Sequence, residues 1–133
     1  MQPGTGAAAA ALWTGLHLIL LLVLSVLVVR QRQKHHVALG DGGVPELAQA
    51  IRAFGNASEY VPAGLVGLGV LALAGAPALA VHIGGASLFA GRVIHAVGLS
   101  RTGETSWPRS IGASLTWLAY VFVASTLLVY AVA

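Results

Sequence analysis

Long apolar stretches separated by short polar segments make up most of the chain. The first stretch, Leu12–Val29, has no charged residue and is close to the roughly 20 residues that a helix needs to cross the hydrocarbon core of a bilayer. Residues 60–91 and 110–133 carry no formal charge either. This pattern predicts an all-α integral membrane protein, a four-helix bundle with spans at about 12–29, 45–74, 77–99 and 109–132.

Two clusters of turn residues separate the second span from its neighbours. Gly40-Asp41-Gly42-Gly43 ends the first loop just before Pro45, a residue type that favours the first turn of a helix. Gly75-Ala76-Pro77 leaves room only for a tight hairpin. The second and third helices are therefore expected to pack as an antiparallel pair, with Pro62 favouring a local kink in the second.

Composition fits a membrane protein and argues against several other classes. Charged residues make up 8% of the chain and hydrophobic residues 57%, whereas about a quarter of a soluble domain is charged. The 133 residues suit a single transmembrane domain, 1–133, and a net charge of +3 confined to a few positions does not suggest nucleic acid as a partner. The chain has no cysteine, so any thiol chemistry requires a thiol from the substrate.

Positive charges gather on one side of the predicted membrane. The first and third loops share that side, and the basic residues in or beside them are Arg30, Arg32, Lys34, Arg101 and Arg109. By the positive-inside rule this side faces the cytoplasm, so both termini face the periplasm or its equivalent.

The second helix carries a polar stripe near its beginning. Arg52, Asn56 and Glu59 are spaced four and three residues apart, so at about 100° per residue they fall within an arc of roughly 60°. In an antiparallel pair, residues equally far from the tight hairpin lie level with each other. This places Arg92 and His95 of the third helix at the depth of Glu59 and Asn56.

Eight polar side chains are therefore expected near the cytoplasmic mouth: Arg30, Arg52, Asn56, Glu59, Tyr60, Arg92, His95 and Arg109. Guanidinium groups suit carboxylates, and a carboxylate with an amide suits an ammonium group. The set fits a small zwitterion with more negative than positive charge, such as glutathione. An alternative is that Glu59 and Arg92 neutralise each other in a structural network, with arginines at helix ends reaching lipid phosphates.

Histidines outside this set give weaker indications of a functional site. His17 lies inside the first span, where a hydrogen bond to another helix is a more common role than ligand binding. His35 and His36 are adjacent, so on a helix they point about 100° apart, and no acidic cluster accompanies them. We therefore expect no metal site.

Three motifs connect the candidate residues with a known family. They are Arg52-x3-Asn56-x2-Glu59-Tyr60-x-Pro62, Gly91-Arg92-x2-His95 and Pro108-Arg109-Ser110. With them, nearly the whole chain resembles the MAPEG family, the membrane-associated proteins of eicosanoid and glutathione metabolism. The segment from Ala38 to Gly43 resembles a bacterial, YecN-like branch of that family.

This resemblance implies a homotrimer in a bacterial inner membrane, with glutathione as a co-substrate in a cytoplasm-facing cleft between subunits. Arg109 matches the arginine that stabilises the glutathione thiolate, which would attack a small apolar substrate arriving from the membrane lipid. The positions that match glutathione-binding residues of the family are Arg30, Arg52, Asn56, Glu59, Tyr60, Arg92 and His95.

Several positions depart from enzymes of the family, among them Phe54 and Gly55, which replace polar residues, so other functions stay open. Leu99 stands where several of them have a tyrosine that shapes the glutathione site, and Ala113 lacks a phenol found in some. A protein that binds lipid or a thiol ligand without catalysis is therefore an alternative to a glutathione transferase or peroxidase. A small multidrug exporter is a third interpretation, but it would favour a carboxylate in the first span, which has none.

Overall fold

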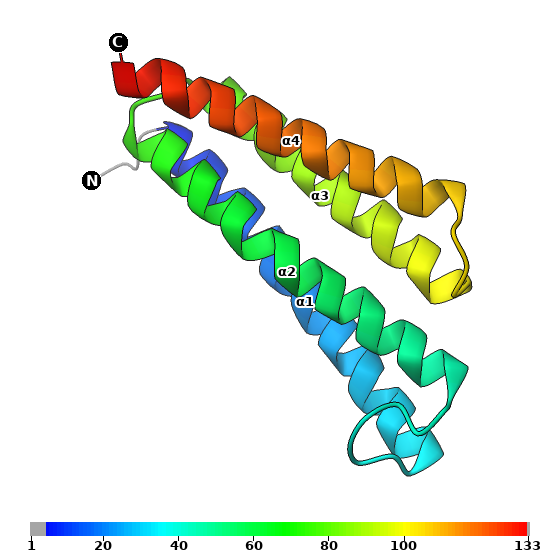
Figure 1. Cartoon of the computed structure of the whole chain (residues 1–133). Helices are drawn as coiled ribbons and strands as arrows, with labels where there is room; N and C mark the ends of the chain where they lie inside the picture. Colours follow the sequence, from blue (N-terminus) through cyan, green and yellow to red (C-terminus); the bar gives the residue numbers. More distant parts are fainter. Residues whose placement is uncertain (1–4, 133) are drawn as a thin grey trace.

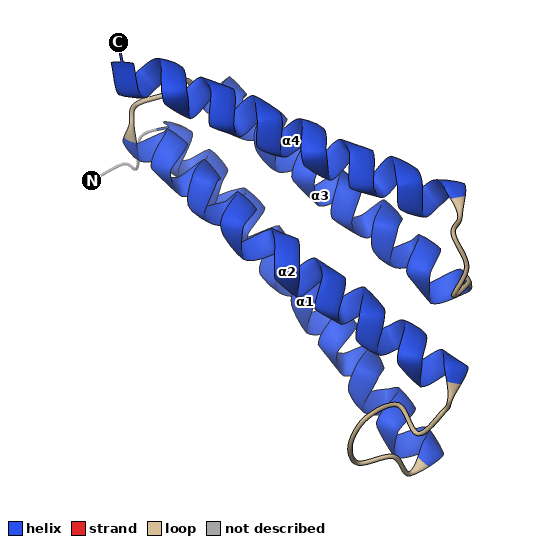
Figure 2. Cartoon of the chain, in the orientation of Figure 1, coloured by secondary structure: helices blue, strands red, loops and turns tan. Residues whose placement is uncertain are grey.

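The computed structural model describes residues 5–132 and consists of helices that run up and down. Their bounds are α1 (Thr5–His35), α2 (Pro45–Leu73), α3 (Ala78–Arg101) and α4 (Trp107–Val132). Figure 2 shows helices and loops, with no strand in the part of the chain that the structure describes. The predicted all-α fold is confirmed.

The helices form two hairpins that separate toward one end of the molecule. In Figure 1 the α1–α2 and α3–α4 pairs lie close together near the two termini and diverge toward the two longer loops. Within residues 5–132, α1 packs against α2 and α3 but does not contact α4. The space between α2 and α4 is therefore not covered by α1.

Three of the four helices are long and apolar enough to cross a membrane, namely α1, α3 and α4. At about 1.5 Å per residue, the 31 residues of α1 extend about 46 Å, well beyond the predicted apolar run. The remaining helix, α2, is not among them, and its first half carries Glu46, Arg52 and Glu59.

The turns form where the sequence predicts them. The amide of Gly43 donates to the Asp41 carboxylate at 2.9 Å, and α2 then begins at Pro45. Beyond the end of α2, Gly75 adopts a φ of +82°, a left-handed conformation that few other residue types accept readily. These turns set the antiparallel order of the first three helices.

The closest helix contact is between α3 and α4. A Cβ added to Gly112 of α4 would lie 2.6 Å from both the carbonyl oxygen of Gly91 and the backbone nitrogen of His95. A Cβ at Gly98 would meet the Arg109 side chain at 2.8 Å. Glycine at these positions therefore lets the two backbones approach closely, as small residues do in membrane bundles.

Candidate functional site

A buried arginine joins three helices at the level of the predicted polar stripe. Arg92 of α3 is only 2% exposed. Its Nη1 donates to the Asn56 Oδ1 of α2 at 2.7 Å, and its Nε donates to the Thr116 Oγ1 of α4 at 2.9 Å. A longer contact of 3.4 Å runs from Nη2 to the Gly112 carbonyl. The acceptors around this guanidinium are therefore neutral.

Thr116 completes this arrangement and was not among the predicted residues. Its hydroxyl accepts from Arg92 and donates to the Gly112 carbonyl at 2.9 Å. Its side chain has no exposed surface. A hydroxyl in an otherwise apolar stretch of α4 was the available signal, because such a group must find a hydrogen-bond partner inside the bundle.

Two tyrosines border the same level of the bundle. The Tyr60 ring lies against the Arg92 guanidinium, with its centroid 4.9 Å from Cζ, a favourable cation–π distance. The Tyr120 hydroxyl of α4 donates to the Tyr60 carbonyl of α2. We call the residues Asn56, Tyr60, Arg92, Thr116 and Tyr120 the polar layer.

Glu59 and Arg52 lie outside the polar layer and interact with each other. Their side chains are 59% and 63% exposed, and Arg52 Nη1 lies 3.9 Å from Glu59 Oε1. The alternative pairing of Glu59 with Arg92 is therefore wrong. Exposed ion pairs of this kind contribute at most about 1 kcal/mol, so both groups can exchange their partner for a ligand at small cost.

Arg52 and Arg109 line one cleft near the loop end of the bundle. The cleft holds about 280 Å³, and its lining residues are Ala48, Gln49, Arg52, Leu99, Gly103 and Arg109. Arg109 Nη1 donates to the Glu104 carbonyl at 2.7 Å and to the Gly103 carbonyl at 3.3 Å. Because a guanidinium has five N–H donors, these contacts leave several of them for a ligand.

The other predicted residues are placed differently. His95 is half-buried, with its backbone at the close crossing of α3 and α4. Arg30 is exposed on α1, where it lines a separate groove with Lys34, and α1 does not contact α4 within residues 5–132. The structure thus brings Arg52 and Arg109 to one cleft, whereas Arg30 of the same chain lines a different groove.

Arg32 and His17 of α1 each have a partner within the chain. Arg32 Nη1 donates to the Gly40 carbonyl at 2.8 Å, and this contact with the loop was not predicted. His17 Nδ1 donates to the Trp13 carbonyl of its own helix at 2.6 Å, while its ring packs edge-on against Phe89 of α3. The predicted contact of His17 with another helix is therefore aromatic, and its hydrogen bond is local.

Among residues 5–132, no group of three or more His, Cys, Asp or Glu side chains is arranged to hold a metal ion.

The long apolar helices and the buried polar layer define a small membrane protein built as a four-helix bundle. The chain belongs to the MAPEG family, whose model matches residues 10–129, and this confirms the resemblance seen in the motifs. It is similar to the protein "Inner membrane protein YecN" of Escherichia coli (strain K12), with 42% identity over 114 residues that cover 86% of each chain. The protein of the same name from Escherichia coli O6:H1 (strain CFT073) gives the same identity and coverage.

Proposed function

We propose that the protein binds glutathione at the Arg52–Arg109 cleft and transfers it to apolar electrophiles, as a glutathione transferase or peroxidase of the bacterial inner membrane. The observation that carries this proposal is the convergence of two arginines from different helices on one cleft of about 280 Å³. Membership of a family associated with glutathione supports the choice of ligand.

The charges around the cleft complement those of glutathione, which has two carboxylates and one ammonium group. Arg52 offers guanidinium donors for a carboxylate, and Glu59 beside Arg52 offers a carboxylate for the ammonium. Asn56 presents its Oδ1 to Arg92, so its amide N–H groups remain available as donors. In this proposal Arg92 positions Asn56, while Tyr60 and His95 border the ligand.

Arg109 is the residue that we propose acts in catalysis. A guanidinium beside the bound thiol favours the thiolate, because the two opposite charges attract each other. The thiol proton goes to water. The thiolate sulfur then forms a bond to an electrophilic carbon, and the leaving group departs with the electron pair of the bond that breaks.

We further propose a homotrimer in which Arg30 completes the site of a neighbouring subunit. Arg30 lies on α1, where it lines a different groove, and α1 does not contact α4 within residues 5–132, so a cleft of another copy is the one that we propose it completes. The basic residues of the longer loops support a cleft on the cytoplasmic side and termini on the periplasmic side.

A protein that binds a lipid or thiol ligand without catalysis is the second candidate. The observation in its favour is Leu99, which lines the cleft where the family resemblance leads us to expect a tyrosine. An aliphatic side chain there removes a hydroxyl that would otherwise orient the ligand.

Calorimetric titration of the detergent-purified protein with glutathione tests the proposal. Arg52→Gln and Glu59→Gln should weaken binding, whereas Arg101→Gln should not, since Arg101 is an exposed arginine outside the cleft lining. Arg109→Ala should retain most of the binding but lose the ultraviolet absorbance of the bound thiolate. Absence of binding up to about 10 mM, a free energy weaker than about −3 kcal/mol, contradicts a glutathione function.

A further inference from the structure

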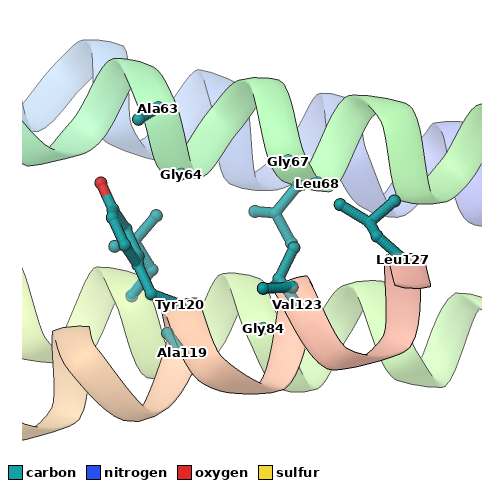
Figure 3. Close-up of a pocket in the computed structure, with 11 residues that line it drawn as sticks. Ala63, Gly64, Gly67, Leu68, Gly84, Ala119, Tyr120, Val123 and Leu127 are labelled. Atoms are coloured by element: carbon teal, nitrogen blue, oxygen red, sulfur yellow. The ribbon is translucent and has the colours of Figure 1, made fainter. Parts of the chain in front are cut away.

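Two pockets outside the Arg52–Arg109 cleft differ in their polar groups. Figure 3 shows the first, where the Tyr120 side chain reaches from α4 toward α2. Tyr120 is the only polar side chain in its lining, and the hydroxyl already donates to the Tyr60 carbonyl. The second, which we call the loop-end pocket, lies among α1, α2 and α3 near the longer loops. Its lining residues are Leu27, Gln31, Glu46, Gln49, Ala50 and Ser100.

Gln31 contributes a buried acceptor to the loop-end pocket. Its Oε1 atom is enclosed and has no hydrogen-bond partner within residues 5–132. Buried polar atoms in proteins nearly always have a partner, so an unpaired one requires an explanation. A donor that does not belong to the chain would satisfy this oxygen.

Two further lining residues add acceptors. Ser100 Oγ donates its proton to the Ala96 carbonyl at 2.8 Å, so its own lone pairs remain free to accept. Glu46 is exposed in the first turn of α2, and no cationic side chain pairs with it within residues 5–132. The lining contains no basic residue. The loop-end pocket is therefore rich in acceptors and carries a net negative charge.

The number and placement of these acceptors match one primary ammonium group. Such a group has three N–H donors and no acceptor. Gln31 of α1, Glu46 of α2 and Ser100 of α3 each supply one acceptor residue. A quaternary ammonium group has the same charge but no N–H to donate. The hydrogen-bonding groups therefore favour a primary amine over other organic cations.

The rest of the lining and the volume indicate a short carbon chain beside the ammonium group. Leu27 and Ala50 offer apolar contacts to methylene groups. The pocket holds about 190 Å³. An engineered protein cavity of about 150 Å³ binds benzene, so this space is large enough for a two-carbon amine.

We propose that the loop-end pocket binds the primary ammonium group of a short alkylamine, which is either a free amine or the headgroup amine of a lipid. Gln49 lines both this pocket and the Arg52–Arg109 cleft, so two spaces of opposite charge adjoin each other. The site does not rest on the glutathione proposal, because Gln31, Glu46 and Ser100 are absent from the cleft lining.

Saturation-transfer NMR of the full chain in a maltoside detergent tests the site with ethanolamine as the probe. Choline keeps the hydroxyethyl group but has no N–H donor, and it should bind at least tenfold more weakly. Glu46→Gln removes the negative charge with little change of shape and should weaken ethanolamine binding about tenfold, and Gln31→Leu should also weaken it. Glu104→Gln is the matched control, since Glu104 is exposed outside the pocket lining, and it should bind as the wild type does.

A second comparison separates the two sources of the amine. Dioctanoyl phosphatidylethanolamine is measured against dioctanoyl phosphatidylcholine in the same detergent. A lipid source predicts that the ethanolamine lipid binds more tightly than ethanolamine itself and that Glu46→Gln weakens both. A free amine predicts that the lipid binds no more tightly than ethanolamine.

Four results would overturn the site. The first is no ethanolamine binding to the wild type up to about 10 mM, a free energy weaker than about −3 kcal/mol, which would leave water as the occupant. The second is equal binding of choline and ethanolamine. The third is wild-type affinity in both Glu46→Gln and Gln31→Leu. The fourth is displacement of ethanolamine by glutathione, because the pocket would then belong to the cleft. A protein that binds ethanolamine but not glutathione would contradict only the proposed function.

Discussion

Arg92 and Arg52 have the same side chain in opposite surroundings. Arg92 is 2% exposed and its hydrogen bonds go to the protein's own neutral acceptors, whereas the Arg52 side chain is 63% exposed and lies 3.9 Å from a single exposed carboxylate. A buried guanidinium is costly unless its donors are satisfied, and an exposed one is not. Burial and satisfied donors therefore mark the structural arginine, whereas a loosely paired arginine in a cleft is the one available to a ligand.

Replacing the buried arginine should have the largest effect. Arg92→Gln leaves the buried Thr116 and the half-buried Asn56 without their charged donor, and an unsatisfied buried group costs about 1–3 kcal/mol. The free energy of unfolding in mixed detergent micelles should fall by about 3 kcal/mol. Arg52→Gln, the matched change at an exposed site, should lower it by less than about 1 kcal/mol. An equal loss of unfolding free energy in the two variants would contradict the distinction between a structural Arg92 and an exposed Arg52.

The close crossing of α3 and α4 should be the next most sensitive point. Gly112→Ala places a methyl group 2.6 Å from backbone atoms of α3, which must move apart, and overpacking of this kind costs about 1–3 kcal/mol. Gly69→Ala is the control, because a Cβ there meets nothing within 4 Å. It should be neutral or slightly stabilising in the same unfolding measurement. A stable Gly112→Ala protein would mean that α4 does not need this approach to complete the polar layer.

The smallest effect on stability should come from the tyrosine at the edge of the polar layer. Tyr120→Phe removes one hydrogen bond to the Tyr60 carbonyl and keeps the ring, so unfolding should become easier by about 1 kcal/mol. Tyr130→Phe, near the end of α4 where the side chain is 39% exposed, should change little. A loss above about 3 kcal/mol would show that Tyr120 supports more than one contact.

Much of the fold was predictable because charges and turn residues mark the helix ends. Counting residues outward from the tight hairpin placed Arg92 and His95 at the depth of Glu59 and Asn56, and the structure joins Arg92 to Asn56 rather than to Glu59. Depth does not fix rotation about a helix axis. Pairing of Glu59 with Arg92 was therefore a possible alternative to ligand binding, whereas the structure pairs Glu59 with Arg52 of the same helix.

The parts that were missed depend on contacts that spacing does not encode. The apolar surface of α4 extends around much of the helix, so the pattern shows that the Thr116 hydroxyl needs a partner but does not show that this partner is Arg92. The sequence prediction used Arg32 only as a positive charge of the first loop, although its side chain donates a hydrogen bond to the Gly40 carbonyl. The direction of Arg30 depends on the packing of α1, which loop length alone does not determine.

The most direct test of the account is the thermal unfolding midpoint of Arg52→Gln and Arg92→Gln, each measured without and with glutathione. We predict that Arg52→Gln unfolds at the wild-type temperature without ligand and loses the rise that glutathione gives the wild type. Arg92→Gln should unfold at a lower temperature and still rise with glutathione. A full ligand-induced rise in Arg52→Gln, or a wild-type midpoint in Arg92→Gln, would contradict the assignment of binding to the exposed arginine and of stability to the buried one.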